Sequence, residues 1–480
     1  MFSSLLAIPS TLVVLLLYYM FSVVFPRSGG EYVYVGRTLH PSLGFTVNAV
    51  MTLCYVSVGA VEATWVSTFT FGPMFSLLNL EGWTSVSPIA TFFSVPINQL
   101  AIGVLMVVLF NLLYLFGNRV AFATKKVLFV ITGIGMVIYI AAMVSMSNSS
   151  FVANWNSVSS FSYNQVISTA STAGLYSTSV IFPVSTVAIA IIYADLAVNG
   201  GQMSAYAGGE VRNPQRNQLI GMVGSAAVFF ALMFVVIATA YSTMGYNFVT
   251  SISYLAVNGN ANYVLPAPLP ALWVVVSYVM RSPIFTIVMA IGFLASTIGN
   301  IMVITFEATR IVFAWSFDAV IPTKFSDVNE RFHTPHYALL LIVVVETLFV
   351  YLTLFTAFSA FLTYEVPCIF TVVTVVGIAA VALPYEKRWK DLFSSCPRII
   401  TRKVAGVPLM VIVGVLAIVD GIVIAYVSTA PQISGPFTPE YLYMAVGFFV
   451  CGFAAYWASH LIQKRRGIPV DLMQRAIPPE

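Results

Sequence analysis

Residues 195–202 read Asp-Leu-Ala-Val-Asn-Gly-Gly-Gln and lie inside a largely apolar stretch that runs from Val180 to Ala207. Adjacent glycines weaken a helix, and the flanking amides bring polar side chains into an apolar run. Within a bilayer, unwound backbone is tolerated only where it is buried in protein or lines a water-filled cavity. The pattern therefore predicts a helix that is interrupted deep in a membrane and offers its main-chain groups to a ligand. Alternatively, the small residues let two helices approach closely.

The composition places this stretch in a membrane protein. Of 480 residues, 59% are apolar and only 8% are charged, whereas soluble domains are about 45–50% apolar and about 25% charged. Since each crossing takes about 20 residues, crossings fill the chain and leave no room for a catalytic domain outside the bilayer. The 21 basic residues are scattered and form no stripe of the kind that binds nucleic acid. The sequence predicts an all-α polytopic membrane protein that occupies residues 1–480 as a single transmembrane domain.

Apolar runs predict about eleven membrane-spanning helices. A further short helix, Trp273 to Met280, is expected at the membrane interface. The spanning runs are Phe2 to Phe25, Ser42 to Phe71, Val95 to Phe116, Val127 to Met146, Val180 to Ala207, Leu219 to Tyr241, Ile284 to Ala308, Tyr337 to Phe358, Thr363 to Leu383, Val407 to Thr429 and Tyr441 to Ile462.

Lysine and arginine fall in alternate loops, and basic loops stay on the cytoplasmic side. Every basic residue except Arg281 obeys this alternation. We therefore expect a multi-pass protein of the plasma membrane whose carboxyl terminus, with residues 463–480 as a tail, is cytoplasmic. An odd number of spans then places Met1 outside. A cleaved signal peptide does not explain this start, because no basic segment precedes the first apolar run.

Three cytoplasmic loop motifs resemble those of a known family. They are Pro-Arg-Ser-Gly-Gly-Glu-Tyr-Val-Tyr at residues 26–34, Gly-Glu-Val-Arg-Asn-Pro-Gln-Arg at residues 209–216, and a third that starts at Thr309-Arg310, continues as Ser-Phe-Asp-Ala-Val-Ile-Pro at residues 316–322 and ends with Asn329, Arg331, Thr334 and Pro335. In this order they resemble the loops of amino acid permeases of the amino acid-polyamine-organocation superfamily. The family usually has Asp-Gly where this chain has Asp318-Ala319.

This resemblance implies the inverted-repeat transporter fold, similar to that of LeuT, in which two inverted five-helix repeats enclose a midplane site. When the first motif is aligned with the family pattern, the first span corresponds to the family's second helix, so the chain holds helices 2 to 12. The first helix, which carries half of the usual substrate site, is then lacking. We expect either that the chain starts downstream of its natural beginning or that it is a natural variant.

The same resemblance identifies residues 195–202 as the unwound part of helix six, whose backbone contacts substrate. The candidate substrate contacts are Ala197, Asn199, Gly200, Gly201 and Gln202, with Asn300 of the seventh span. At Gln202 the family often carries an acid, so recognition or coupling is expected to differ here. Ser296 and Thr297 supply hydroxyls beside Asn300, where sodium-coupled relatives use hydroxyls. Such hydroxyls more often bond to their own helix.

Acidic residues inside the spans are candidate coupling groups. Asp195, Glu346 and Asp420 lie near mid-depth and Glu62 and Glu365 in the outer half, with no lysine or arginine at their depth. An unpaired charge there costs at least about 2.5–3.5 kcal/mol, so each is protonated, hydrated or opposed by a cation from elsewhere. We expect proton coupling first and sodium second.

Asp195 is the first candidate, since it lies about one helical turn from the Gly200-Gly201 pair. Glu62 and Glu346 follow. For Glu346 and Asp420 hydrogen bonding between helices is the commoner role, Glu62 reaches toward the outer interface, and Glu365 either belongs to an external gate or is exposed to outside water.

The sequence therefore predicts a secondary active transporter of amino acids or related amines. It has no signature of an enzyme, a metal site or a cofactor site, and the expected partners are the small-molecule substrate, the coupling ion and the lipid bilayer. The alternative is a non-transporting membrane sensor or a truncated, inactive permease copy.

Overall fold

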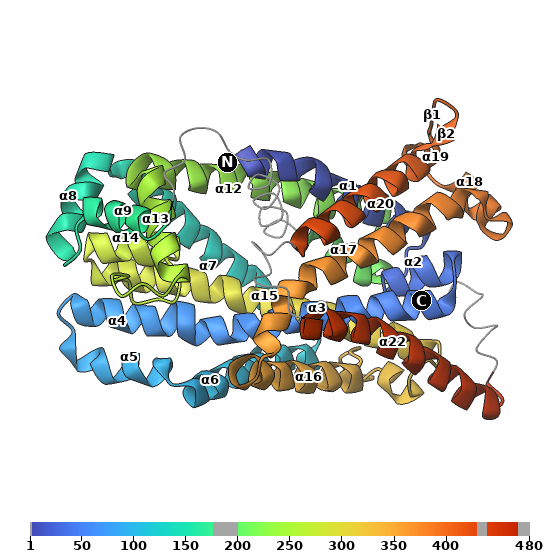
Figure 1. Cartoon of the computed structure of the whole chain (residues 1–480). Helices are drawn as coiled ribbons and strands as arrows, with labels where there is room; N and C mark the ends of the chain where they lie inside the picture. The colour runs from blue at the N-terminus through green and yellow to red at the C-terminus, as the bar shows by residue number, and fades with distance from the viewer. Residues whose placement is uncertain (1, 176–199, 430–438, 469–480) are drawn as a thin grey trace.

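The computed structural model describes residues 2–175, 200–429 and 439–468, and this part is almost entirely helical (Figure 1). Its only regular strands form one short antiparallel pair, β1 (Lys403–Val404) and β2 (Val407–Pro408). Ten segments of the described residues are long and apolar enough to cross a membrane. The prediction of an all-α polytopic membrane protein is confirmed. Of the predicted fifth span, Val180 to Ala207, residues 180–199 lie outside the described part.

The spanning segments follow the predicted runs. They are α1 (Phe2–Val24); α3 (Pro41–Trp65) with the π-helical turn η1 (Val66–Phe71) and α4 (Gly72–Leu80); α6 (Pro96–Asn111) with η3 (Leu112–Phe116); α7 (Asn118–Ser145); α11 (Pro214–Leu219) with η6 (Ile220–Gly224) and α12 (Ser225–Met244); α15 (Pro283–Phe317); α16 (His336–Phe355); α17 (Phe358–Ala382); α20 (Leu409–Ser428); and α22 (Pro439–Arg465).

Three predicted spans were too short at one end. The fourth was expected to begin at Val127, but α7 begins at Asn118. The second span was expected to end at Phe71, but the helix continues to Leu80, because the π-helical turn η1 carries it past Pro73. The seventh was expected to end at Ala308, but α15 continues to Phe317. Its last turns hold Glu307 and Arg310, which are buried in protein contacts, so these charges do not end the helix.

Shorter elements gather at the two ends of the bundle. At the left of Figure 1 lie α8 (Asn148–Val158), α9 (Tyr163–Thr172), α13 (Tyr246–Val257) and α14 (Leu272–Met280). At the right lie α2 (Glu31–Thr38), α18 (Lys390–Ser395) and the β1–β2 pair. The predicted interfacial helix is α14, but Trp273 to Val279 are all buried. It therefore packs inside the group formed by α8, α9, α13 and α14, which we call the cap.

Arg281, the exception to the charge alternation, has a structural explanation. It follows α14 with φ of 49°. Its guanidinium donates to the carbonyl oxygens of Leu80 at 2.8 Å and Val158 at 3.0 Å. Both carbonyls belong to the last residues of helices, α4 and α8, where the macrodipole favours a cation. This arginine therefore joins α8 of the cap to the end of α4.

Candidate functional site

The described part of the interrupted stretch begins at Gly200, whose φ of 146° is a conformation that favours glycine. The following residues, Gly201–Tyr206, form the 3₁₀ helix η4. The side-chain oxygen of Gln202 accepts a hydrogen bond from the Gly200 N–H at 3.0 Å. The chain is therefore not a continuous α-helix here. Asp195, Ala197 and Asn199 lie outside the described residues, and their roles stay predictions.

Gly201 and Gln202 are tightly packed. A Cβ atom on Gly201 would lie 3.0 Å from a methyl carbon of Leu15 in α1 and 3.3 Å from the carbonyl oxygen of Met222 in η6. Gln202 is buried and donates to the Tyr55 hydroxyl of α3 at 3.0 Å. At Gly201 the structure therefore has the close helix approach that was the alternative interpretation. At Gly200 the described residues approach less closely, since the nearest of their heavy atoms would lie 4.0 Å from such a Cβ.

The structure brings two other candidates together. The amide of Asn300 in α15 donates to both carboxylate oxygens of Glu62 in α3, at 2.7 and 2.8 Å. The other polar candidates of this span do not join them: the Thr297 hydroxyl donates to the Phe293 carbonyl of its own helix at 3.0 Å, and Ser296 is exposed. Glu62 and Asn300 thus form a contact between helices without help from either hydroxyl.

Glu346 is fully buried between helices. One of its oxygens accepts from the Thr305 hydroxyl at 2.6 Å and from the Asn111 amide at 3.2 Å. The other oxygen has no hydrogen-bond partner among the described residues and faces Gly59, where a Cβ atom would lie 2.7 Å away. The carboxyl group joins α16 to α15 and α6, which is the interhelical role that the sequence favoured.

Three further acidic residues lie within the spans, and their observed positions can be compared with the expectations from the sequence. Asp420 of α20 accepts from Ser10 of α1 at 2.9 Å, also as an interhelical contact. Glu365 is 7% exposed, so the interpretation that it faces outside water was wrong, and its role in an external gate stays a prediction. Glu307, 6% exposed, was missed because it lies at the charged end of its apolar run. Its place three residues before Arg310 would have suggested an ion pair within the helix, but Arg310 pairs with Glu210 instead.

The first loop motif holds η4 in place. Gly29 donates its N–H to the Tyr206 carbonyl at 3.1 Å, and a Cβ on Gly30, where φ is 54°, would overlap the Tyr206 ring at 2.3 Å. Glu31 is buried and accepts from the Tyr206 hydroxyl at 2.7 Å. Burial raises the pKa of Glu31, and hydrogen bonds from Tyr18, Tyr206 and Asn48 partly oppose that rise.

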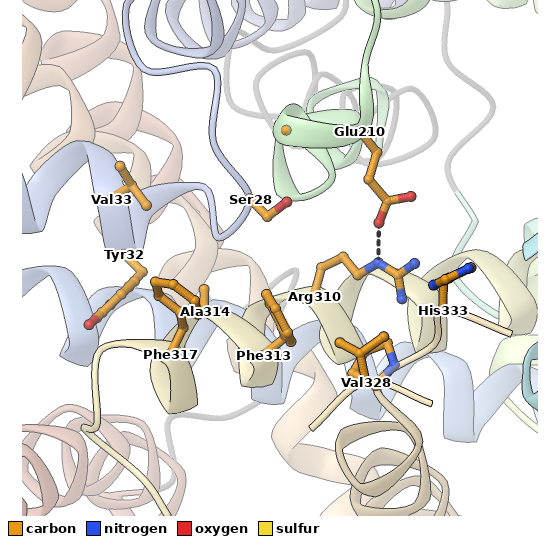
Figure 2. Close-up of a pocket in the computed structure, with 12 residues that line it drawn as sticks. Ser28, Tyr32, Val33, Glu210, Arg310, Phe313, Ala314, Phe317, Val328 and His333 are labelled. Atoms are coloured by element: carbon orange, nitrogen blue, oxygen red, sulfur yellow. Dashed lines mark hydrogen bonds and ion pairs between the residues drawn. The ribbon is translucent and has the colours of Figure 1, made fainter. Parts of the chain in front are cut away.

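All three loop motifs meet at one cavity of about 410 Å³, shown in Figure 2. The sequence placed them on the same side of the membrane but did not predict this cavity. Its lining is Ser28, Tyr32 and Val33 from the first motif, Gly209 and Glu210 from the second, and Arg310, Phe313, Ala314, Phe317, Val328, His333 and Pro335 from α15 and the loop that follows it.

An ion pair forms one wall of the cavity. Arg310 donates from Nε to Glu210 Oε1 at 2.7 Å, with side-chain exposures of 5% and 44%. Asn118 at the start of α7 donates to the other oxygen of Glu210 at 3.3 Å. The Arg310 guanidinium also lies over the Phe306 ring, 4.2 Å from its centroid. Glu210 therefore ties the second motif to α7 and α15.

The departure from the family motif lies at a strained position. Ala319 has φ of 57°, a left-handed conformation in which glycine avoids a steric cost of about 1–2 kcal/mol. The neighbouring Asp318 is buried, pairs with Arg37 of α2 and accepts from the Tyr32 hydroxyl at 2.7 Å. The glycine usual in the family is thus explained by the backbone, and the alanine is held in place by the contacts around it.

Comparison with known proteins agrees with these loop motifs. A family model described as amino acid permease matches residues 1–451. No curated protein matches the chain.

Proposed function

The chain belongs to the amino acid permease family, and from that premise we propose that it is a secondary active transporter that moves amino acids or related amines by alternating access and is driven by protons. Residues 1–480 form one transmembrane domain in the plasma membrane, and the carboxyl-terminal tail, residues 463–480, lies in the cytoplasm. The protein performs no covalent chemistry. The positive-inside alternation supports this orientation.

The observation that carries proton coupling is the environment of the acids in the spans. Glu62 is bound by the Asn300 amide, and Glu346 by Thr305 and Asn111. Among the described residues neither acid forms an ion pair with lysine, arginine or histidine. A carboxyl group held by neutral donors in an apolar setting is able to take up and release a proton as its hydration changes.

For the substrate site, we propose the region around the glycine pair. Among the described residues the nearest heavy atom to a Cβ on Gly200 would lie 4.0 Å away, and the φ of 146° places its main chain outside the helical conformation. Ala197, Asn199, Gly201, Gln202 and Asn300 complete the proposed contacts. Asp195 remains the first coupling candidate, together with Glu62 and Glu346. Ser296 and Thr297 would be needed only for sodium coupling, and the bond of Thr297 to its own helix supports protons instead.

Uptake by proteoliposomes tests this function. The purified 480-residue protein is reconstituted, and accumulation of radiolabelled L-leucine, L-arginine, L-glutamate and putrescine is measured under an inward proton gradient and, separately, an inward sodium gradient. We expect the proton gradient to drive accumulation of at least one of them. The Glu62→Gln and Asp195→Asn variants should lose this accumulation but keep exchange of internal for external substrate, whereas Glu330→Gln in an exposed loop should resemble the parent.

The outcomes separate the alternatives. Accumulation that requires sodium and does not depend on pH contradicts proton coupling but is consistent with a secondary active transporter. Binding of an amino acid without uptake or exchange identifies a sensor that keeps the permease scaffold.

A further inference from the structure

The cavity where the loop motifs meet contains a buried cation with free donors. Arg310 is 4% exposed as a residue and lines the cavity. Within the described part of the chain its Nε donates to Glu210, and no other hydrogen bond from this side chain is present there. The two terminal nitrogens, with four N–H groups, have no hydrogen-bond acceptor among the described residues. A guanidinium presents those groups as a planar fork that matches a carboxylate.

The rest of the lining completes a site for a zwitterion. Glu210 is 44% exposed and has carboxylate lone pairs left beside the arginine, so it is suited to an ammonium group. The two charged side chains touch each other, at 2.7 Å, and in an α-amino acid the carboxylate and ammonium groups are likewise attached to one carbon. Phe313 lies next to Arg310, and Ala314 and Phe317 follow farther along α15 in the same lining (Figure 2). Together they offer an apolar surface for a side chain.

We propose that this cavity is a second binding site, on the cytoplasmic side of the transporter, for α-amino acids with apolar side chains. The carboxylate binds the terminal nitrogens of Arg310, the ammonium binds Glu210, and the side chain lies on Phe313 and Phe317. The Nε–Glu210 bond stays in place, because the ligand uses the edge of the guanidinium that Glu210 leaves free. The choice of ligand rests on the proposed function, since the cavity lies on the side to which an importer releases its cargo.

Protection of a cysteine in the lining tests the site independently of transport. Val328 is 43% exposed and lines the cavity. The Val328→Cys substitution is made in a background in which Cys396 and Cys451, the cysteines that are not buried, are replaced by serine. Inside-out vesicles are treated with a membrane-impermeant maleimide. L-leucine at about four times its Kd should slow alkylation about fivefold, since the fraction of unoccupied sites is 1/(1 + [L]/Kd). N-acetyl-L-leucine, without an ammonium, and L-leucinamide, without a carboxylate, should protect far less.

Matched variants show where leucine binds. Arg310→Lys keeps the charge but loses the fork, and Glu210→Gln keeps the shape but loses the charge; each should remove most of the protection. Arg216→Lys, in the exposed part of the second motif, should leave it unchanged. Protection that survives Arg310→Lys comes from a change at another site and overturns the proposal.

Uptake of L-leucine in the same vesicles keeps the two hypotheses apart. Uptake without protection of the Val328→Cys thiol refutes the cytoplasmic site but supports the proposed transport function. Protection without uptake keeps the site and refutes transport of leucine. If neither occurs, the cytoplasmic site is refuted for leucine whatever other substrates the protein carries.

Discussion

The hydroxyl of Tyr206 donates a hydrogen bond of 2.7 Å to the carboxylate of Glu31, across a separation of 175 residues. Tyr18 of α1 donates to the same oxygen, and Asn48 of α3 donates to the other at 2.8 Å. One buried carboxyl group of α2 therefore fixes η4, which directly follows the Gly200 turn, to two membrane-spanning helices. A rearrangement of η4 during transport has to break this contact or carry α2 with it.

Removal of this contact should destabilise the protein. Tyr206→Phe deletes one hydrogen bond to a carboxyl group and should lower the free energy of unfolding by about 1.5–3 kcal/mol. Glu31→Ala should cost more, since it leaves the Tyr18 and Tyr206 hydroxyls and the Asn48 amide without this acceptor. Thermal unfolding of the purified protein in detergent measures both. Tyr254→Phe is the control, because that hydroxyl binds the Ala173 carbonyl at an exposed position. If Tyr206→Phe and Tyr254→Phe lowered the stability equally, the contact with Glu31 would contribute no more than an exposed hydrogen bond.

Stability should also depend on pH through Glu31. Burial raises its pKa in the folded state above the value in the unfolded chain. The resulting stabilisation is complete below the unfolded pKa and is lost as pH rises through the raised folded pKa, because the unfolded chain then gives up the proton more readily. In unfolding series from about pH 4 to pH 8, Glu31→Gln should lose less stability with rising pH than the parent. Glu330→Gln should follow the parent, and a Glu31→Gln slope equal to the parent's would contradict the assignment.

The sequence predicted those parts of the fold that depend on local composition. Apolar runs of sufficient length identified the spans, since their burial in lipid does not depend on which neighbour they meet. The helices α8 and α9 were not predicted, because their Asn- and Ser-rich sequences have weak helical patterns. They are held by tertiary packing, with Trp155 buried against Phe248 at 4.8 Å between ring centroids.

The site was less predictable, for a physical reason. The loop motifs indicated which residues matter, but the pairing of Glu210 with Arg310 and of Glu62 with Asn300 depends on the rotation and depth of separate helices. A periodic pattern fixes which residues share a face of one helix, not which residue on another helix they meet. The approach of Gly201 to Leu15 was open in the sequence for the same reason.

Two glycines provide a matched test of the packing of α17 against α20. A Cβ on Gly377 would lie 2.8 Å from the Gly414 carbonyl oxygen and 3.1 Å from the Ile418 nitrogen, both backbone atoms that cannot move aside easily. Gly377→Ala should therefore cost about 1–3 kcal/mol of stability. Gly447→Ala in α22 places the new methyl group more than 4 Å from every other heavy atom of the described residues that could crowd it and should be neutral or stabilise by up to about 1 kcal/mol. Thermal unfolding compares them, and similar losses would refute the close contact.

The contact between Glu62 and Asn300 should act as one unit in proton-driven uptake. The Asn300 amide binds both oxygens of the carboxylate, so Asn300→Ala removes the donors that hold Glu62 in place, and Glu62→Gln removes the group that they hold. Once either residue has been replaced, replacing the other should have little further effect on the uptake rate. A double-mutant cycle on initial uptake rates should give an interaction energy of about 0.5–3 kcal/mol. The cycle of Glu62→Gln with Glu330→Gln should give none, since Glu330 is exposed in the loop before α16. Losses that multiply in the Glu62–Asn300 cycle would mean that the two residues act separately, and Asn300 would then have to be assigned to the substrate alone.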